Sequence, residues 1–247
     1  MSGPLPKKQN VENPINEPEH LTFSPGSEIP RNLVYWRFPD ESSYVVSPRG
    51  HPHTLRLTPS VYGPSYNPDS VTDPITFVAR RQTDTLFRFS VDLEFEPTSP
   101  GTEAGISLFL TQEQHVDLSI VGVAASRVLQ LNTIGKGNYN GSLTNVTTEV
   151  PRGWRDQKVT LSVEAVDDET YEFSASLASR PRKKIHVGSV DARVLSGDTG
   201  RFTGTLVGVY ASRAGKGGKS KDYAYFSDWK YEGLGQKVDW DVIVPSY

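Results

Sequence analysis

The feature that most constrains this chain is a strict alternation of apolar and polar side chains within short segments. From Phe87 to Phe95, every second residue is apolar, and the residues between are Arg, Ser, Asp or Glu. Successive side chains of a β-strand point to opposite faces, so this pattern predicts a strand with one buried face and one face in water. Hardly any segment carries the 3.6-residue period of an α-helix over a useful length.

Similar short runs recur roughly every ten residues, and the turns between them draw on 21 Gly and 18 Pro. We expect strands at 33–37, 44–47, 54–57, 77–79, 86–95, 104–111, 116–123, 127–133, 158–165, 170–178, 185–191, 202–212 and 224–232. Many short strands joined by turns are typical of sandwiches and jelly rolls. The sequence therefore predicts an all-β protein built as a two-sheet β-sandwich (jelly roll).

The 247 residues are enough for one large sandwich domain, which we place at 29–236. Residues 1–28 are rich in Pro, Asn, Glu and Lys, show no periodicity, and are predicted to be an extended tail or linker. Residues 237–247 form an apolar C-terminal tail. That tail is expected to pack back onto the sandwich or to join copies of the chain in a homo-oligomer.

Composition argues against several classes of function. The net charge is −3, which gives no reason to expect a nucleic-acid partner. The chain has no cysteine, so disulfides and cysteine nucleophiles are excluded. No apolar run is long enough for a membrane span, and no secretory signal is visible. We expect a cytoplasmic protein if Met1 is the native start, and an extracellular one if the chain is a fragment of a secreted enzyme.

Longer motifs carry a family resemblance. FTGTLVGVYASR (202–213) and AYFSDWKYEG (224–233) resemble the end of the C-terminal β-sandwich module of fungal glycoside hydrolase family 43 enzymes, which are β-xylosidases and α-arabinofuranosidases. IPRNLVYWRFPDESSYVVSP (29–48), FVARRQTDTLFRFSVDLEFEP (77–97) and EAGISLFLTQEQHVDLSIV (103–121) resemble its earlier strands. The resemblance covers most of 25–236 and implies a concanavalin-A-like β-sandwich.

The resemblance also limits the activity that can be inferred. In the parent enzymes a five-bladed propeller holds the three acidic residues that hydrolyse the glycoside, and this sequence contains no such propeller. Glycosidase activity is therefore not carried over. Related modules are classed as xylan-binding. In some enzymes a loop of the module reaches toward the propeller's active site, and the segment that includes Phe202 would correspond to that loop.

Aromatic side chains are the first candidates for sugar binding, because a pyranose ring stacks on Trp or Tyr while its hydroxyls bond polar groups. Alternation puts Tyr35 and Trp36 on opposite faces, so only one of them can face a given cleft. Each of these aromatic residues could instead be part of the core. The candidate ligand-binding residues are Tyr35, Trp36, Arg80, Gln82, Phe202, Tyr210, Tyr225 and Trp229.

Candidates for catalysis are few. His115 stands two residues before Asp117, an arrangement that could supply a general base oriented by a carboxylate, and Arg80 could bind an oxyanion. A Ser-His-Asp hydrolase is not expected, because the chain lacks a GxSxG motif. His51 and His53 have no third ligand at a suitable spacing, so we expect no metal and no cofactor.

Two functional hypotheses remain open. The first is a carbohydrate-binding module for xylan or arabinoxylan without glycosidase activity, whose partner is an oligosaccharide. The second is a stand-alone intracellular enzyme of fungal secondary metabolism that dehydrates, cyclises or directs a cycloaddition of a small apolar metabolite in the sandwich cleft. Binding of an apolar metabolite without binding of sugar would separate the second from the first.

Overall fold

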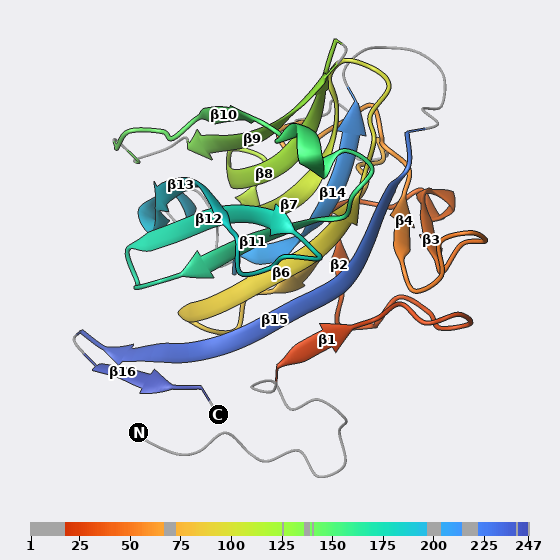
Figure 1. Cartoon of the computed structure of the whole chain (residues 1–247). Helices are drawn as coiled ribbons and strands as arrows, with labels where there is room; N and C mark the ends of the chain where they lie inside the picture. The colour runs from red at the N-terminus through yellow and green to blue at the C-terminus, as the bar shows by residue number, and fades with distance from the viewer. Residues whose placement is uncertain are drawn as a thin grey trace.

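The computed structural model describes residues 18–66, 73–124, 126–135, 139, 141–196, 204–213, 222–240 and 242–246. Within these ranges the strands form two antiparallel sheets that pack face to face (Figure 1). This confirms the predicted all-β sandwich. Three short 3-10 turns connect the described strands: η1 (Glu41–Ser43), η2 (Arg152–Trp154) and η3 (Ala192–Leu195). No helix among the described residues is long and apolar enough to cross a membrane.

The nine-stranded sheet is organised around one long strand, β15 (Ala224–Asp239), which pairs with β6 (Leu86–Glu94) and β4 (Leu55–Leu57). The rest of the sheet extends from these strands through β11 (Val159–Ala165), β12 (Thr170–Leu177) and β13 (Ile185–Asp191) on one side and β3 (Tyr44–Val46) on the other. Two short strands, β1 (Glu19–Leu21) and β16 (Val242–Pro245), also pair with β15.

The seven-stranded sheet lies behind the first. Its spatial order is β10 (Val146–Glu149), β9 (Ser126–Gly135), β8 (Gln114–Val123), β7 (Thr102–Thr111), β14 (Leu206–Arg213), β5 (Phe77–Arg81) and β2 (Val34–Tyr35). Consecutive strands β7, β8 and β9 pair as neighbouring hairpins, whereas β14 is inserted between β7 and β5.

The core between the sheets follows the alternation read from the sequence. Phe87, Phe89, Val91 and Leu93 of β6 are fully buried. Trp229 packs edge-on against Phe89, with ring centroids 4.9 Å apart. Burial of such large apolar side chains is the main favourable contribution to folding.

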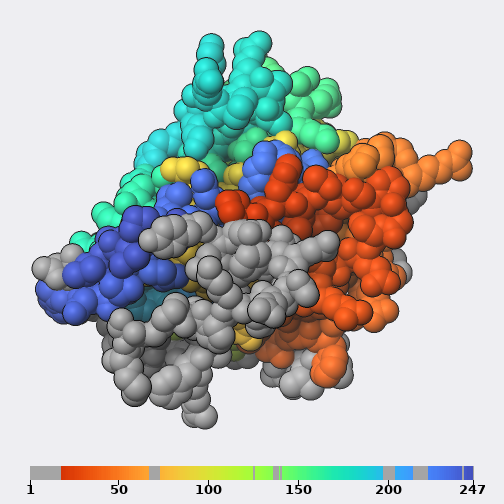
Figure 2. All heavy atoms as spheres, turned by 90° about the horizontal axis from the view of Figure 1, so that it is seen from below, coloured from red at the N-terminus to blue at the C-terminus, as the bar shows by residue number. Residues whose placement is uncertain are grey.

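Three strands were not predicted, and each lacks a clear alternating pattern. β1 has the sequence Glu-His-Leu and lies inside the stretch expected to be a tail, whereas 1–17 fall outside the described residues. β10 has the sequence Val-Thr-Thr-Glu, and β16 is apolar throughout. Figure 2 shows the N-terminal segment in red against the C-terminal segment in blue, in agreement with the β1–β15 pairing.

The C-terminal tail turns back as a hairpin, because β16 pairs with the end of β15 from Gly235 to Asp239. Its apolar side chains stay in contact with solvent: Trp240 is 88% exposed, and Val238, Val242, Ile243 and Val244 are also exposed. The tail therefore extends the sheet without adding to the core.

Candidate functional site

The predicted ligand-binding residues do not form one cleft. Two of them lie in the interior. Trp229 is fully buried, and its Nε1 donates a hydrogen bond to Glu19 Oε1 at 3.1 Å. Arg80 is 8% exposed, its Nη1 lies 3.6 Å from the same Glu19 oxygen, and its guanidinium lies 3.6 Å from the centroid of the Tyr231 ring. Both residues stabilise the fold and are not positioned to contact a ligand that approaches from solvent.

Two further candidates lie apart from each other. Gln82 donates from Nε2 to the Asp84 carbonyl oxygen at 2.8 Å, within the turn between β5 and β6. Tyr35 lies at the sheet edge, where its ring meets Tyr44 edge-on with centroids 5.0 Å apart. Neither Gln82 nor Tyr35 joins the sites described below. Phe202 lies outside the described residues.

Tyr225 lies on the outer face of the nine-stranded sheet, beside its strand partner Arg56 of β4. The His51 ring stacks on Tyr225, with centroids 3.7 Å apart and an angle of 11° between the planes. The next aromatic residue, Tyr223, meets Tyr225 edge-on at 6.4 Å, and the Arg56 guanidinium lies 4.5 Å from the Tyr223 ring centroid. These residues form a continuous aromatic and cationic strip.

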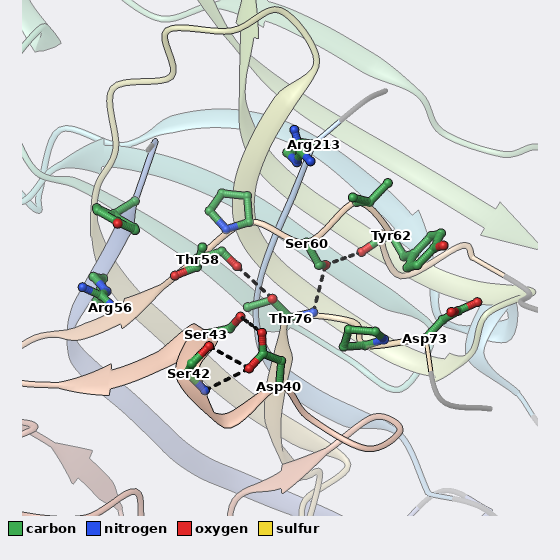
Figure 3. A pocket seen from close by; sticks show the side chains of 14 residues that line it. Asp40, Ser42, Ser43, Arg56, Thr58, Ser60, Tyr62, Asp73, Thr76 and Arg213 are labelled. Atoms are coloured by element: carbon green, nitrogen blue, oxygen red, sulfur yellow. Dashed lines mark hydrogen bonds between the residues drawn. The ribbon is translucent and has the colours of Figure 1, made fainter. Parts of the chain in front are cut away.

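This strip leads to a cavity of about 720 Å³, shown in Figure 3. We call it the Arg56 pocket. Its lining residues come from the η1 turn and the residue before it, from β4 and the segment after it, from the residues just before β5, from the end of β14 and from the residue before β15: Asp40, Ser42, Ser43, Arg56, Thr58, Pro59, Ser60, Val61, Tyr62, Asp73, Pro74, Thr76, Arg213 and Tyr223. The set combines two tyrosines, two arginines, two aspartates and several hydroxyl groups.

Hydrogen bonds hold the walls of the Arg56 pocket in place. Asp40 accepts from the Ser42 hydroxyl at 2.7 Å, and Ser60 donates to the Tyr62 carbonyl at 2.6 Å and accepts from the Thr76 amide at 3.0 Å (Figure 3). The Arg56 Nε atom, by contrast, is buried and has no hydrogen-bond partner among the described residues. A buried donor without a partner is costly unless a ligand or water completes it.

Trp36 and Tyr210 lie on the outer face of the seven-stranded sheet, the face turned away from the core. They belong to a second apolar cluster of Ile75, Phe77, Ala79, Phe109 and Tyr210, against which Trp36, Tyr62, Tyr66 and Leu206 pack. We call it the outer cluster. Tyr62 stacks on Tyr66 with centroids 3.8 Å apart and also lines the Arg56 pocket, so the cluster and the pocket adjoin.

Buried polar groups accompany the outer cluster. Burial raises the pKa of the Glu103 carboxyl, although the Ser212 hydroxyl donates to it at 2.7 Å. Burial and the nearby Glu103 raise the pKa of Tyr210 well above its usual value. Within the described ranges, the buried atoms on this face that form no hydrogen bond are Trp36 Nε1, Ser107 Oγ, His115 Nδ1 and Asp117 Oδ1. Such a concentration of unpaired polar atoms is unusual for a surface with only a structural role.

His115, which the sequence suggested as a candidate general base, is fully buried beside the outer cluster. Its Nδ1 lies 2.9 Å from Asp117 Oδ2, as the spacing of two residues predicted. The structure adds Ser65, whose Oγ lies 3.0 Å from His115 Nε2. No sequence signal pointed to Ser65, a lone serine in a loop 50 residues before the histidine.

In the described part of the chain, no three His, Asp or Glu side chains are grouped as a metal site.

The family of β-xylosidase C-terminal concanavalin A-like domains matches residues 22–232. The Bacteroides ovatus xyloglucan-locus protein GH43B shares 24% identity over 94% of this chain with a TM-score of 0.73, and a xylan β-1,4-xylosidase of Bacillus halodurans shares 22% over 94% with a TM-score of 0.73. This chain spans 41% of each of them. A Saccharomyces cerevisiae protein of unknown function matches 82% of this chain over 96% of its own length, with 16% identity and a TM-score of 0.56.

Proposed function

Because this chain belongs to the family of β-xylosidase C-terminal concanavalin A-like domains, we propose that it is a carbohydrate-binding module for xylan-type polysaccharides. The similar structures include a xylan β-1,4-xylosidase and a protein of a xyloglucan locus, and each of these proteins is much longer than this chain. The proposed function is binding, without the glycosidase activity of the longer proteins.

The observation that carries this proposal is the unpaired Arg56 Nε in the wall of the Arg56 pocket. The guanidinium is held over the Tyr223 ring, so its plane is oriented before a ligand arrives. The Arg56 Nε–H has no hydrogen-bond partner among the described residues, and a guanidinium can donate to the neighbouring hydroxyls of a sugar.

The other groups of the pocket suit the same ligand. Tyr62 and Tyr223 supply aromatic surface for the C–H face of a pyranose, and Asp73 and Arg213 supply an acceptor and donors for its hydroxyls. A cavity of about 720 Å³ lies within the usual size range of small-ligand sites. The strip of Tyr225 and His51 beside the pocket could contact the next sugar along a chain.

The test is calorimetric titration with xylohexaose and soluble arabinoxylan. Saturable heat is expected for the unaltered chain. Arg56→Met should weaken binding by about 10- to 150-fold, because hydrogen bonds from a charged donor contribute about 1.5–3 kcal/mol. Arg88→Met is the matched control. Arg88 pairs with Glu164 and Glu232 on the same sheet, outside the pocket.

Absence of heat with both ligands would refute the proposal. Equal affinities for Arg56→Met and Arg88→Met would place the sugar elsewhere. No feature of the described residues, and none of the similar proteins named above, favours the alternative of a secondary-metabolism enzyme.

A further inference from the structure

Three polar side chains stand in a row beside the outer cluster: Ser65, His115 and Asp117. Ser65 Oγ lies 3.0 Å from His115 Nε2, and His115 Nδ1 lies 2.9 Å from Asp117 Oδ2. A hydroxyl, an imidazole and a carboxylate in this sequence of contacts form the constellation that activates serine as a nucleophile. It is recognised by geometry and roles and recurs on unrelated folds, so it does not require the GxSxG motif whose absence led us not to expect a Ser-His-Asp hydrolase.

The fold explains why these residues meet. His115 and Asp117 are two residues apart on β8, so both side chains point to the outer face of the sheet. Ser65 comes from a segment fixed to the same sheet by bridges from Ser60 to Ser212 and from Tyr62 to Ile75. His115 and Asp117 are therefore held by a strand, which positions side chains more firmly than a loop, whereas Ser65 lies on a loop that is anchored to the same sheet.

Exposure differs along the row. His115 is fully buried and Asp117 is 5% exposed, whereas Ser65 is exposed to solvent. A nucleophile must be reachable by its substrate, while the groups behind it gain from being shielded, because electrostatic interactions are stronger away from water. The row thus has its nucleophile at the surface and its base in the interior.

The row lacks some of the hydrogen bonds that a purely structural network would have. Although His115 Nδ1 and Asp117 Oδ2 lie 2.9 Å apart, neither His115 Nδ1 nor Asp117 Oδ1 forms a hydrogen bond among the described residues. Contacts of catalytic groups are often poorly aligned without substrate and tighten when it binds. Structural networks, in contrast, are normally complete in the interior.

We propose that Ser65, His115 and Asp117 form a nucleophilic site that hydrolyses short carboxylic esters. Ser65 Oγ attacks the ester carbonyl carbon as its proton passes to His115 Nε2, and the C–O bond to the alcohol breaks as that proton passes to the leaving oxygen. Water then attacks the acyl-serine, gives one proton to His115, and releases the carboxylic acid as Ser65 regains its proton. Asp117 faces the imidazolium that forms in each half.

The reaction also needs an N–H donor for the developing oxyanion. Trp36 Nε1 is the candidate donor on this face, because it is buried and forms no hydrogen bond among the described residues. Its ring packs on Phe109 at 4.9 Å, and Phe109 stacks on His115 at 5.8 Å. These aromatic rings border the row. A short acyl ester such as an acetate needs little binding surface beyond the row, so it is the substrate class that we assign.

The experiment combines labelling and turnover. The whole chain is treated with a fluorophosphonate, which reacts covalently with activated serines, and the labelled peptide is located by mass spectrometry. Hydrolysis of p-nitrophenyl acetate is measured in parallel. Label is expected on Ser65, and Ser65→Ala should lose about 10²–10⁴-fold in hydrolysis, whereas the control Ser227→Ala should retain both signals.

Two further variants test the roles. His115→Asn should lose labelling at Ser65 while far-UV circular dichroism reports whether this buried substitution folds. Trp36→Phe should keep the label and lose up to about 100-fold in turnover, because it removes the N–H and keeps an aromatic ring. Ser65 is exposed, so Ser65→Ala remains a valid test even where a buried variant unfolds.

No label on Ser65, or equal hydrolysis by Ser65→Ala and the unaltered chain, would overturn the proposal. The inference does not depend on sugar binding, since neither the labelling reagent nor the ester is a carbohydrate. Titration of Ser65→Ala with xylohexaose keeps the two proposals separate, because the Arg56 pocket does not include Ser65.

Discussion

Replacing Glu19 by Gln is expected to destabilise the fold by about 3 kcal/mol, even though the residue lies in a stretch that reads as a tail. Glu19 Oε1 accepts from Trp229 Nε1 at 3.1 Å and lies 3.6 Å from Arg80 Nη1. Its other oxygen accepts from Asn32 Nδ2. The Glu19 and Arg80 side chains are only 8% and 9% exposed, so the guanidinium has little access to water.

The magnitude follows from what remains after the substitution. Removing one partner of a buried ion pair costs about 3–5 kcal/mol, since the other charge stays buried. Arg80 keeps hydrogen bonds to Thr83 Oγ1 and to the Arg81 carbonyl, both at 3.1 Å, and keeps the Tyr231 ring. Gln also keeps an acceptor for Trp229. These contacts favour the lower end of the range, which corresponds to a fall in Tm of roughly 6–12 °C for a domain of this size.

The assay is urea unfolding followed by tryptophan fluorescence, with a double-mutant cycle as the control. Glu19→Leu alone should cost more than Glu19→Leu combined with Arg80→Met, because the double variant leaves no unpaired charge. If Glu19→Gln unfolds at the same urea concentration as the unaltered chain, Glu19 does not compensate Arg80 and the reasoning fails. Additive costs in the cycle would likewise show that the two residues act independently.

Three other predictions concern stability. Burial raises the pKa of the Glu103 carboxyl, so the folded chain binds the carboxyl proton more tightly than the unfolded chain does. The free energy of unfolding should therefore fall as pH rises from the ordinary glutamate range to the raised pKa. Glu103→Gln should flatten that slope in urea titrations between pH 4 and 8. Gly105→Ala should cost about 3 kcal/mol or more, because its Cβ would lie 2.1 Å from the Leu118 carbonyl oxygen, while Gly153→Ala, with nothing within 4 Å, should be tolerated in the same thermal scan. Trp240→Ser should change the free energy of unfolding by less than about 0.5 kcal/mol, because the side chain is 88% exposed; a larger change would mean that it packs on something.

Alternation predicted much of the fold because it reports which face of a strand each side chain uses. It does not report what covers that face. Trp229 and Arg80 were proposed as ligand-binding residues because of their chemical type, yet both point to the interior, where Glu19 of an unpredicted strand contacts them. Tyr210 does lie on the outer face, but the aromatic residues around it leave it 1% exposed.

For the candidate sites, too, the sequence pattern predicts contacts within one strand but not contacts between distant segments. The pairing of His115 with Asp117 was predictable, since two residues on one strand share a face. The approach of Ser65 to His115 was not predictable, because the two residues are 50 positions apart and their contact depends on where the loop that carries Ser65 is anchored. The Arg56 pocket likewise brings together Asp40, Thr76 and Arg213, which no local pattern connects.

The position of β15 has a consequence for how the chain is made. This strand lies between β6 and β4 and also pairs with β1, so three of its partners are made long before it, whereas β16 follows it in the chain. Arg88 of β6 meets Glu232 across 144 residues of sequence. During synthesis, the nine-stranded sheet therefore stays open along two edges until the end of the domain has left the ribosome. Slow folding and a need for protection of those edges during translation follow from this order of strands.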